Sequence, residues 1–232
     1  MRRSMFKNVA AVLCAAMLLA GLAALPAQAA YTKQEALIDE ALITFKRCVA
    51  DPNMKWFREH LKNARGILIF PSFLKGAFLI GGEWGTGVLL VHDIKTGEWS
   101  QPVFYTMGSA SIGLQIGAKS AEMILMIMTD KGTDALLATS IKLGADVSAA
   151  AGPVGVGAKV ETVDILAFSR SEGLFGGISV EGTVIMPRDD WNRAFYGRDV
   201  RPVDIIIRKA VSNPKAEPLI RTVKEVCEGR MP

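Results

Sequence analysis

The most distinctive chemistry in this sequence is a concentration of basic side chains between residues 46 and 75. Within this segment only Asp51 and Glu59 are acidic. Arg58, Lys62 and Arg65 follow the i, i+4, i+7 spacing that places side chains on one face of a helix. Cations beside aromatic residues on an amphipathic helix are typical of segments that contact anionic lipid. The candidate lipid-contact residues are Lys46, Arg47, Lys55, Trp56, Arg58, Lys62, Arg65 and Lys75.

The same segment has a simpler interpretation, which is the solvated face of a helix that packs on a core. In that case Trp56 and Phe57 would belong to the core, and the cations would only face water. A contact with lipid phosphates would weaken as salt is added, because exposed charges are screened. Both interpretations stay open at the level of the sequence.

The familiar patterns of metal sites and catalytic nucleophiles are missing from the sequence. His60 and His92 are the only histidines and do not form an HxxxH pair. The cysteines lack the CxxC spacing of a zinc site, and Ser109, Ser111 and Ser179 all lack the G-x-S-x-G pattern of a nucleophile elbow. We therefore expect no metal, no cofactor and no enzymatic activity.

Residues 152–159, GPVGVGAK, resemble a phosphate-binding loop in composition but not in order. A Walker A loop needs GxxxxGK followed by Ser or Thr, whose hydroxyl holds Mg²⁺. Here Ala158 displaces the lysine, and Val160 stands in place of the hydroxyl. We therefore expect no nucleotide ligand.

Residues 1–29 have the layout of a secretory signal peptide. Arg2, Arg3 and Lys7 precede an apolar stretch over residues 9–25, and Ala27-Gln28-Ala29 is an A-x-A cleavage site. We expect cleavage after Ala29 and a protein of the periplasm or cell envelope, peripheral on a membrane where it binds one. The alternative is a retained anchor, although the apolar stretch falls short of the roughly 20 residues that span a bilayer.

Removing this segment changes the charge of the protein. The whole chain has 27 Lys and Arg against 23 Asp and Glu, and three of the cations lie in residues 1–29. The remaining 24 cations nearly balance the 23 acids. A general attraction of the whole surface to nucleic acid is therefore not expected.

Two cysteines, Cys48 and Cys227, remain near opposite ends of the mature chain. Both fall in segments with helical patterns, and an oxidising compartment permits a disulfide between them. The alternative is two separate buried thiols.

The elements that would position these residues are helices at both ends and strands between them. Thr32 and Glu35 form a capping box before a helix over residues 33–49, and a second helix is expected over 53–64. Apolar, β-branched runs punctuated by glycine follow from Gly66, with a hairpin turn expected at residues 95–98. Shorter helices are expected at Asp130–Thr139, which Asp130 would cap, and at 189–196 and 215–228.

Glycines inside apolar strands indicate bulges, bends or close backbone approach. Such glycines are concentrated between residues 66 and 182. We therefore predict an α+β fold: a curved or barrel-like, mainly antiparallel, glycine-rich β-sheet with flanking N- and C-terminal helices. A single domain over residues 30–232 is the most economical organisation.

Residues 170–182, RSEGLFGGISVEG, form a segment that is rich in glycine and also contains charged residues. Its four glycines favour a turn and close packing of a bent strand pair. Arg170 would pair with an acid such as Glu172 or Glu181, or would reach an anionic ligand.

This stretch resembles the R-S-x-G-L-[FY]-x-G-x-S hallmark of the SYLF-domain family. Other segments follow in the order that the family requires, among them ARGILIFP at 64–71, KGAFLIGGEWGTGVLL at 75–90 and GLQIGAKSAEMILMIMT at 113–129. The resemblance covers residues 35–200 and implies a lipid-binding module. Eukaryotic members bind phosphoinositides, and some bind actin, but an exported chain is not expected to meet either.

We therefore expect a non-enzymatic protein that contacts anionic phospholipid through its basic N-terminal helical region. The alternative is a structural or interaction module that holds a protein partner or an apolar ligand in a groove.

Overall fold

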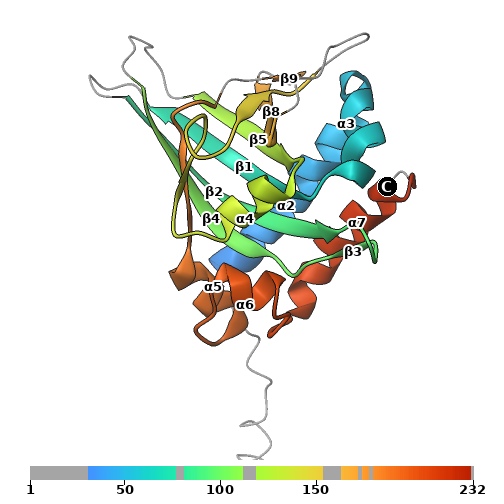
Figure 1. Cartoon of the computed structure of the whole chain (residues 1–232), viewed down its shortest axis with the longest axis vertical. Coiled ribbons are helices and arrows are strands. Elements are labelled where there is room, and N and C mark those ends of the chain that lie inside the picture. Colours follow the sequence, from blue (N-terminus) through green and yellow to red (C-terminus); the bar gives the residue numbers. More distant parts are fainter. Residues whose placement is uncertain are drawn as a thin grey trace, which may run out of the picture. The chain divides into compact units, whose positions relative to one another are not determined.

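The computed structural model describes residues 31–76, 81–111, 119–153, 163–171, 174–177 and 180–230. Thr32–Pro232 form one compact unit built on a single sheet (Figure 1). The expected signal peptide lies outside the described residues, so the leader and its cleavage stay predictions.

Helix α2 (Lys33–Ala50) begins where the sequence predicts. The N–H of Glu35 donates to the Thr32 hydroxyl over 3.2 Å, and the Glu35 carboxylate accepts from the N–H of Thr32 over 2.8 Å. This capping box satisfies backbone donors that a helix N-terminus leaves free. The helical elements are α2 (Lys33–Ala50), η1 (Pro52–Met54), α3 (Lys55–His60), η2 (Leu61–Asn63), α4 (Asp130–Leu136), α5 (Asp189–Tyr196), α6 (Pro202–Ile206), η3 (Pro214–Ala216) and α7 (Glu217–Cys227).

The strands form one curled sheet that resembles half of a barrel (Figure 1). Its order is β6-β10-β4-β2-β1-β5-β8-β7, with β3 paired to β2 and β9 paired to β8. All pairs are antiparallel except β7 with β8. The strands are β1 (Gly66–Gly76), β2 (Gly81–Asp93), β3 (Glu98–Trp99), β4 (Val103–Ser111), β5 (Lys119–Ile127), β6 (Ile141–Lys142), β7 (Ala149–Ala151), β8 (Ile165–Ser171), β9 (Leu174–Gly177) and β10 (Val184–Pro187). The predicted α+β class, curved antiparallel sheet and terminal helices are confirmed.

Helices cover both faces of the sheet, because alternate side chains of each strand point to opposite faces. Ile67 and Ile69 of β1 pack with α2, α3, α5 and α7 on one face. Leu68 and Phe70 pack with α4 and α6 on the other face. Figure 1 shows α2 behind the central strands and α4 in front of them. The central strands are therefore buried on both sides, which explains their long apolar runs.

A bulge in β1 bends the centre of the sheet. Pro71 lies in this strand, and the register of β1 shifts there against both β2 and β5. The strand opposite carries Gly87, where a Cβ atom would lie 2.6 Å from the Phe70 ring and 2.7 Å from the carbonyl oxygen of Ile69. This position accepts only a hydrogen atom, as expected for a glycine that marks a bend.

Two predicted helices differ from the structure in detail, and one helix of the structure was not predicted. The segment expected as one helix over 53–64 is divided into η1, α3 and η2, so Arg65 follows the helical region and does not share a helix face with Arg58. Helix α4 is capped by Thr129, whose hydroxyl accepts from the N–H of Gly132 over 3.1 Å, and not by Asp130. Helix α6 was not predicted, because five residues with β-branched Val203, Ile205 and Ile206 give little helical signal.

The segment with the family hallmark contains the β8–β9 hairpin. Phe168 pairs with Gly177 and Arg170 with Phe175. Gly182 has φ +79°, a conformation that residues with a Cβ rarely adopt, so it permits the turn before β10. The predicted strand pair and a turn at Gly182 are present, whereas Glu172, Gly173 and Ser179 lie outside the described residues.

Candidate functional site

Arg58, which was predicted to contact lipid, instead holds the end of α2. Its Nη1 donates to the carbonyl oxygens of Val49 and Asp51 over 2.9 and 2.7 Å. The last carbonyl groups of a helix have no partner within the helix, so a guanidinium is well suited to satisfy them. Arg58 therefore joins α2 to α3, and its guanidinium is engaged within the fold.

Arg47 and Arg170 share one carboxylate on the sheet. Glu122 of β5 lies directly opposite Arg170 of β8 in the sheet register, with 3.4 Å between Oε2 and Nη1. Arg47, in the last turn of α2, approaches Oε1 of the same carboxylate to 2.5 Å. The structure thus gives Arg170 an acidic partner, Glu122, that the sequence did not suggest, whereas the expected partner Glu172 lies outside the described residues. The hallmark arginine thus helps to attach the end of α2 to the sheet.

The other predicted cations are divided between ion pairs and open solvent. Arg65 Nε lies 2.9 Å from the Asp130 carboxylate of α4, and Lys55 makes a longer contact of 3.7 Å with Glu59. Lys46 and Lys62 are exposed, whereas the side chain of Lys75 lies outside the described part of the chain. The cations therefore do not form one continuous helix face.

The aromatic residues beside these cations belong to the core. Phe57 is fully buried. Trp56 is partly buried and stacks on His60, with 3.9 Å between the ring centroids, and it also approaches Phe168 of β8. Neither ring is free to enter a membrane without leaving these contacts, so the packing interpretation holds for both.

Cys48 and Cys227 are free thiols in the structure. Cys48 is completely buried on the core face of α2, while Cys227 at the end of α7 is partly buried. Burial raises the pKa of both thiols, because the thiolate loses its hydration. The structure therefore has two separate thiols and no disulfide between Cys48 and Cys227.

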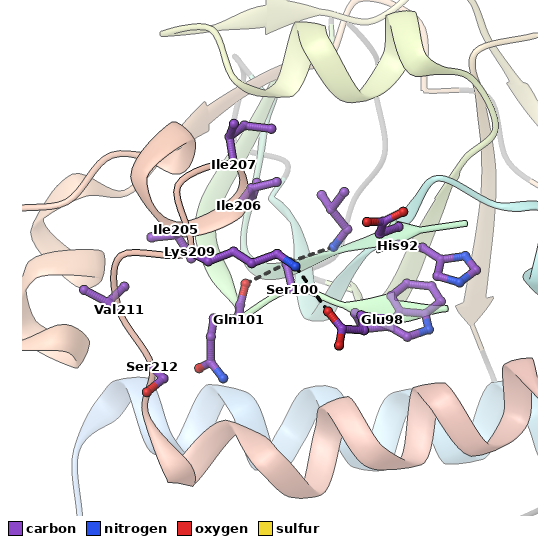
Figure 2. A pocket seen from close by; sticks show the side chains of 13 residues that line it. His92, Glu98, Ser100, Gln101, Ile205, Ile206, Ile207, Lys209, Val211 and Ser212 are labelled. Atoms are coloured by element: carbon purple, nitrogen blue, oxygen red, sulfur yellow. Dashed lines mark hydrogen bonds and ion pairs between the residues drawn. The ribbon is translucent and has the colours of Figure 1, made fainter. Parts of the chain in front are cut away.

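A groove lies between the β2–β3 hairpin and the segment that follows α6 (Figure 2). Its volume is about 460 Å³, within the range of about 300–1,000 Å³ that is typical of ligand pockets. Residues 91–93 and 98–101 form one wall, and residues 205–207, 209, 211 and 212 form the other. We call this feature the β3 groove.

The walls of the β3 groove are largely apolar. Val91, Trp99 and Ile206 lie along it, and Trp99 stacks on His92 with 4.5 Å between the ring centroids. Ile207 is 61% exposed at its edge, which is unusual for so large an aliphatic side chain. An apolar group that entered the groove would cover surface that water now contacts.

Charged groups stand at one end of the groove. Lys209 reaches across to Glu98, with 3.1 Å between Nζ and Oε2 (Figure 2). Asp93 accepts the N–H of Lys95 over 3.0 Å and that of Thr96 over 3.4 Å. Burial opposes ionisation of Asp93, but these bonds outweigh it and lower its pKa. Asp93 is therefore a carboxylate at neutral pH.

The described residues contain neither a cluster of three metal-ligating side chains nor a helix with the length and apolar character of a membrane span. His60 and His92 each place Nδ1 against a backbone carbonyl, that of Trp56 and that of Ala64 respectively. These contacts give both histidines structural roles.

Comparison with known proteins agrees with the hallmark segment. The family model described as "Ysc84: Las17-binding protein actin regulator" matches residues 108–226, which is just over half of the chain. The chain belongs to this family, the SYLF or Ysc84 family. The match includes the β8–β9 hairpin with Arg170 and the α6 wall of the β3 groove.

Several members of the SYLF family are similar to this chain over much of its length. Protein YSC84 of Saccharomyces cerevisiae is 33% identical over 172 residues, which cover 71% of this chain and 36% of the relative. LAS seventeen-binding protein 3 of the same yeast is 34% identical, with coverage of 71% and 37%. SH3 domain-containing YSC84-like protein 1 of Bos taurus is 26% identical, with coverage of 72% and 50%. The chain thus spans from about a third to half of these relatives.

Proposed function

We propose that this chain is a non-enzymatic binding module, which holds a segment of a protein partner in the β3 groove. The groove carries the proposal, because it combines apolar walls, an exposed isoleucine and charged groups in one concave surface. Concave apolar surfaces with a few placed polar groups are the usual form of a recognition site. The name LAS seventeen-binding protein 3 refers to a bound protein, and this supports a protein partner here too.

Anionic phospholipid is the second candidate ligand. Lys46 and Lys62 are exposed and support an electrostatic contact, although Arg58 and Trp56 are engaged within the fold. Either function would operate in the periplasm or cell envelope, because residues 1–29 have the layout of an export signal.

The proposal can be tested by photo-crosslinking in cells that produce the full chain. A photoreactive amino acid at Ser212, an exposed position that lines the groove, should give a protein adduct of defined mass. The same amino acid at Lys62, outside the groove, serves as the matched control. Ile207→Asp should remove the Ser212 adduct, whereas Ile43→Asp, which changes the 47% exposed isoleucine of α2, should not.

If anionic phospholipid is the ligand, a different set of results is expected. Binding to anionic liposomes that falls with added salt and disappears in a Lys46→Glu, Lys62→Glu variant would indicate a lipid-binding surface. If this were found without any protein adduct at Ser212, the groove proposal would be rejected in favour of lipid.

A further inference from the structure

Two carboxylates face each other where the β3 groove meets the hairpin. Asp93 of β2 is directly paired with Glu98 of β3 in the register of the two strands. Like charges at directly opposed positions destabilise a strand pair. Both residues line the groove together with one cation, Lys209. The charged end of the groove therefore has one more negative than positive side chain.

Lys209 is held in an unfavourable backbone conformation. Its φ of +49° is the only positive value of a non-glycine residue in the described part of the chain. A side chain with a Cβ rarely adopts this region, and such outliers are concentrated at binding and switch sites. The N–H of Ala210 donates to the carbonyl oxygen of Asp204 over 2.9 Å, which helps to fix the turn after α6.

The contact between Lys209 and Glu98 is easily replaced. The side chains are 63% and 61% exposed, so water and salt screen their attraction. The neighbouring Arg208 pairs with Asp204 over 2.6 Å and does not take part. A cation supplied from outside could therefore displace Lys209 from Glu98 at little cost.

We propose that the β3 groove recognises a protein segment in which a lysine or arginine lies next to an apolar residue. The cation takes the place of Lys209 beside Asp93 and Glu98, and the apolar side chain covers Ile206 and Ile207. This inference deepens the proposed function and rests on it. The excess of negative charge on the groove wall favours a positively charged side chain in the partner. The exposed Ile207 favours an apolar side chain next to it.

Binding of short probe peptides to the full chain tests this chemistry. The probes are fluorescein-labelled peptides of four residues, Lys-Leu-Lys-Leu, Lys-Ser-Lys-Ser and Glu-Leu-Glu-Leu, followed by fluorescence anisotropy at low salt. We expect the first to bind more tightly than the other two. Equal binding of Lys-Ser-Lys-Ser would show that the apolar wall does not contribute, and would overturn the inference.

Changes at Lys209 and Glu98 give opposite expected effects. Lys209→Gln removes the competing cation and should raise the affinity for Lys-Leu-Lys-Leu by about two- to fivefold, the factor expected for an exposed ion pair. Glu98→Lys should abolish measurable binding of this peptide and allow Glu-Leu-Glu-Leu to bind. A purely structural role of Lys209 would not raise affinity when the side chain is removed.

Lys215 supplies a matched control for Lys209. It is also 63% exposed and pairs with a glutamate, Glu35, over 3.5 Å, but it lies outside the groove. Lys215→Gln should leave the affinity for Lys-Leu-Lys-Leu unchanged. The same gain in both variants would indicate a general charge effect and overturn the inference.

The two proposals fail in different ways. A protein adduct at Ser212 together with no preference among the three peptides would leave the groove as a protein site and reject its cationic-apolar partner. The absence of both results would reject the groove itself.

Discussion

Arg58 illustrates how the surroundings of a single side chain decide its role. Its neighbours in the sequence suggested a basic surface, but its guanidinium donates to two carbonyl oxygens at the end of α2. Both bonds come from Nη1, and a lysine keeps the charge but places its nitrogen one bond nearer to the backbone. The role of Arg58 therefore depends on the position of its donor nitrogen more than on its charge.

Arg58→Lys should destabilise the protein by about 1–2 kcal/mol, because it leaves a partly buried carbonyl without its donor. The measurement is the free energy of unfolding in urea. Lys62→Met, at an exposed position of the same helical region, should change this free energy by less than about 0.5 kcal/mol. An equal effect of the two substitutions would contradict the structural role of Arg58.

Asp164 is a buried carboxylate that joins the residue before α4 to the residue before β7. It accepts from the Thr129 hydroxyl over 2.6 Å and from the N–H and hydroxyl of Ser148 over 2.9 and 2.8 Å, and Lys131 lies 3.5 Å away. Burial raises the pKa of Asp164, but these contacts outweigh burial and lower it to about 2.

This carboxylate should make stability depend on pH in the acid range. The folded pKa lies below the ordinary value of 3.8, so the unfolded chain takes up the proton first as pH falls. The stabilisation is complete above pH 3.8 and is lost as pH falls from there towards 2. Asp164→Asn should cost about 1–3 kcal/mol at pH 7 and flatten this dependence. Asp134→Asn, at an exposed position of α4, should do neither.

The roles of these residues could not be read from the sequence, because their partners are far away in it. Glu122 lies 75 positions after Arg47, and Asp164 lies 35 positions after Thr129. Local spacing predicted that Arg58, Lys62 and Arg65 share a helix face, which is wrong because Arg65 lies beyond η2. Only the fold determines which of them meet an acid and which face solvent.

At the scale of elements, the β1 bulge depends on one glycine in the strand beside it. Gly87→Ala should destabilise the protein by about 1–3 kcal/mol, because the new methyl group would overlap the Phe70 ring and a backbone carbonyl. Thermal and urea unfolding would measure the effect. Shortening the ring with Phe70→Leu in the same chain should cost less than the two separate effects combined. Strict additivity would show that the methyl group and the ring do not meet.

Elements with strong local signals were predicted well, and those that depend on tertiary contacts were not. The capping box located the start of α2, and glycine placed the hairpin turn, where Gly97 has φ +73°. The expected second helix is divided because Arg58 and the buried Met54 and Phe57 fix its parts against α2 and the sheet. No local pattern reports such packing.

At the scale of the whole molecule, α2 and α7 lie side by side across the same face of the sheet (Figure 1). Lys215 pairs with Glu35 near the start of both helices. The β3 groove likewise joins segments that are more than a hundred residues apart. A sequence without structure therefore could suggest that a groove exists but not which residues line it.

The reaction rates of the two thiols measure how closely α2 and α7 are packed into the fold. Cys48 should react with a disulfide reagent at least about tenfold more slowly than Cys227, because it is buried and its pKa is raised further. Unfolding should expose both to labelling without any reductant. A chain that gains two hydrogens in mass on reduction, and labels only afterwards, would contradict the free thiols of the structure.

The packing of α2 against α7 has a consequence for synthesis. Until α7 has left the ribosome, Phe45 and its neighbours on α2 lack part of their apolar cover, as does the sheet beneath them. A nascent chain in this state exposes the kind of surface that chaperones hold and that promotes aggregation. Completion of the fold is thus delayed until α7 has been synthesised, and removal of α7 should affect solubility more than its length suggests.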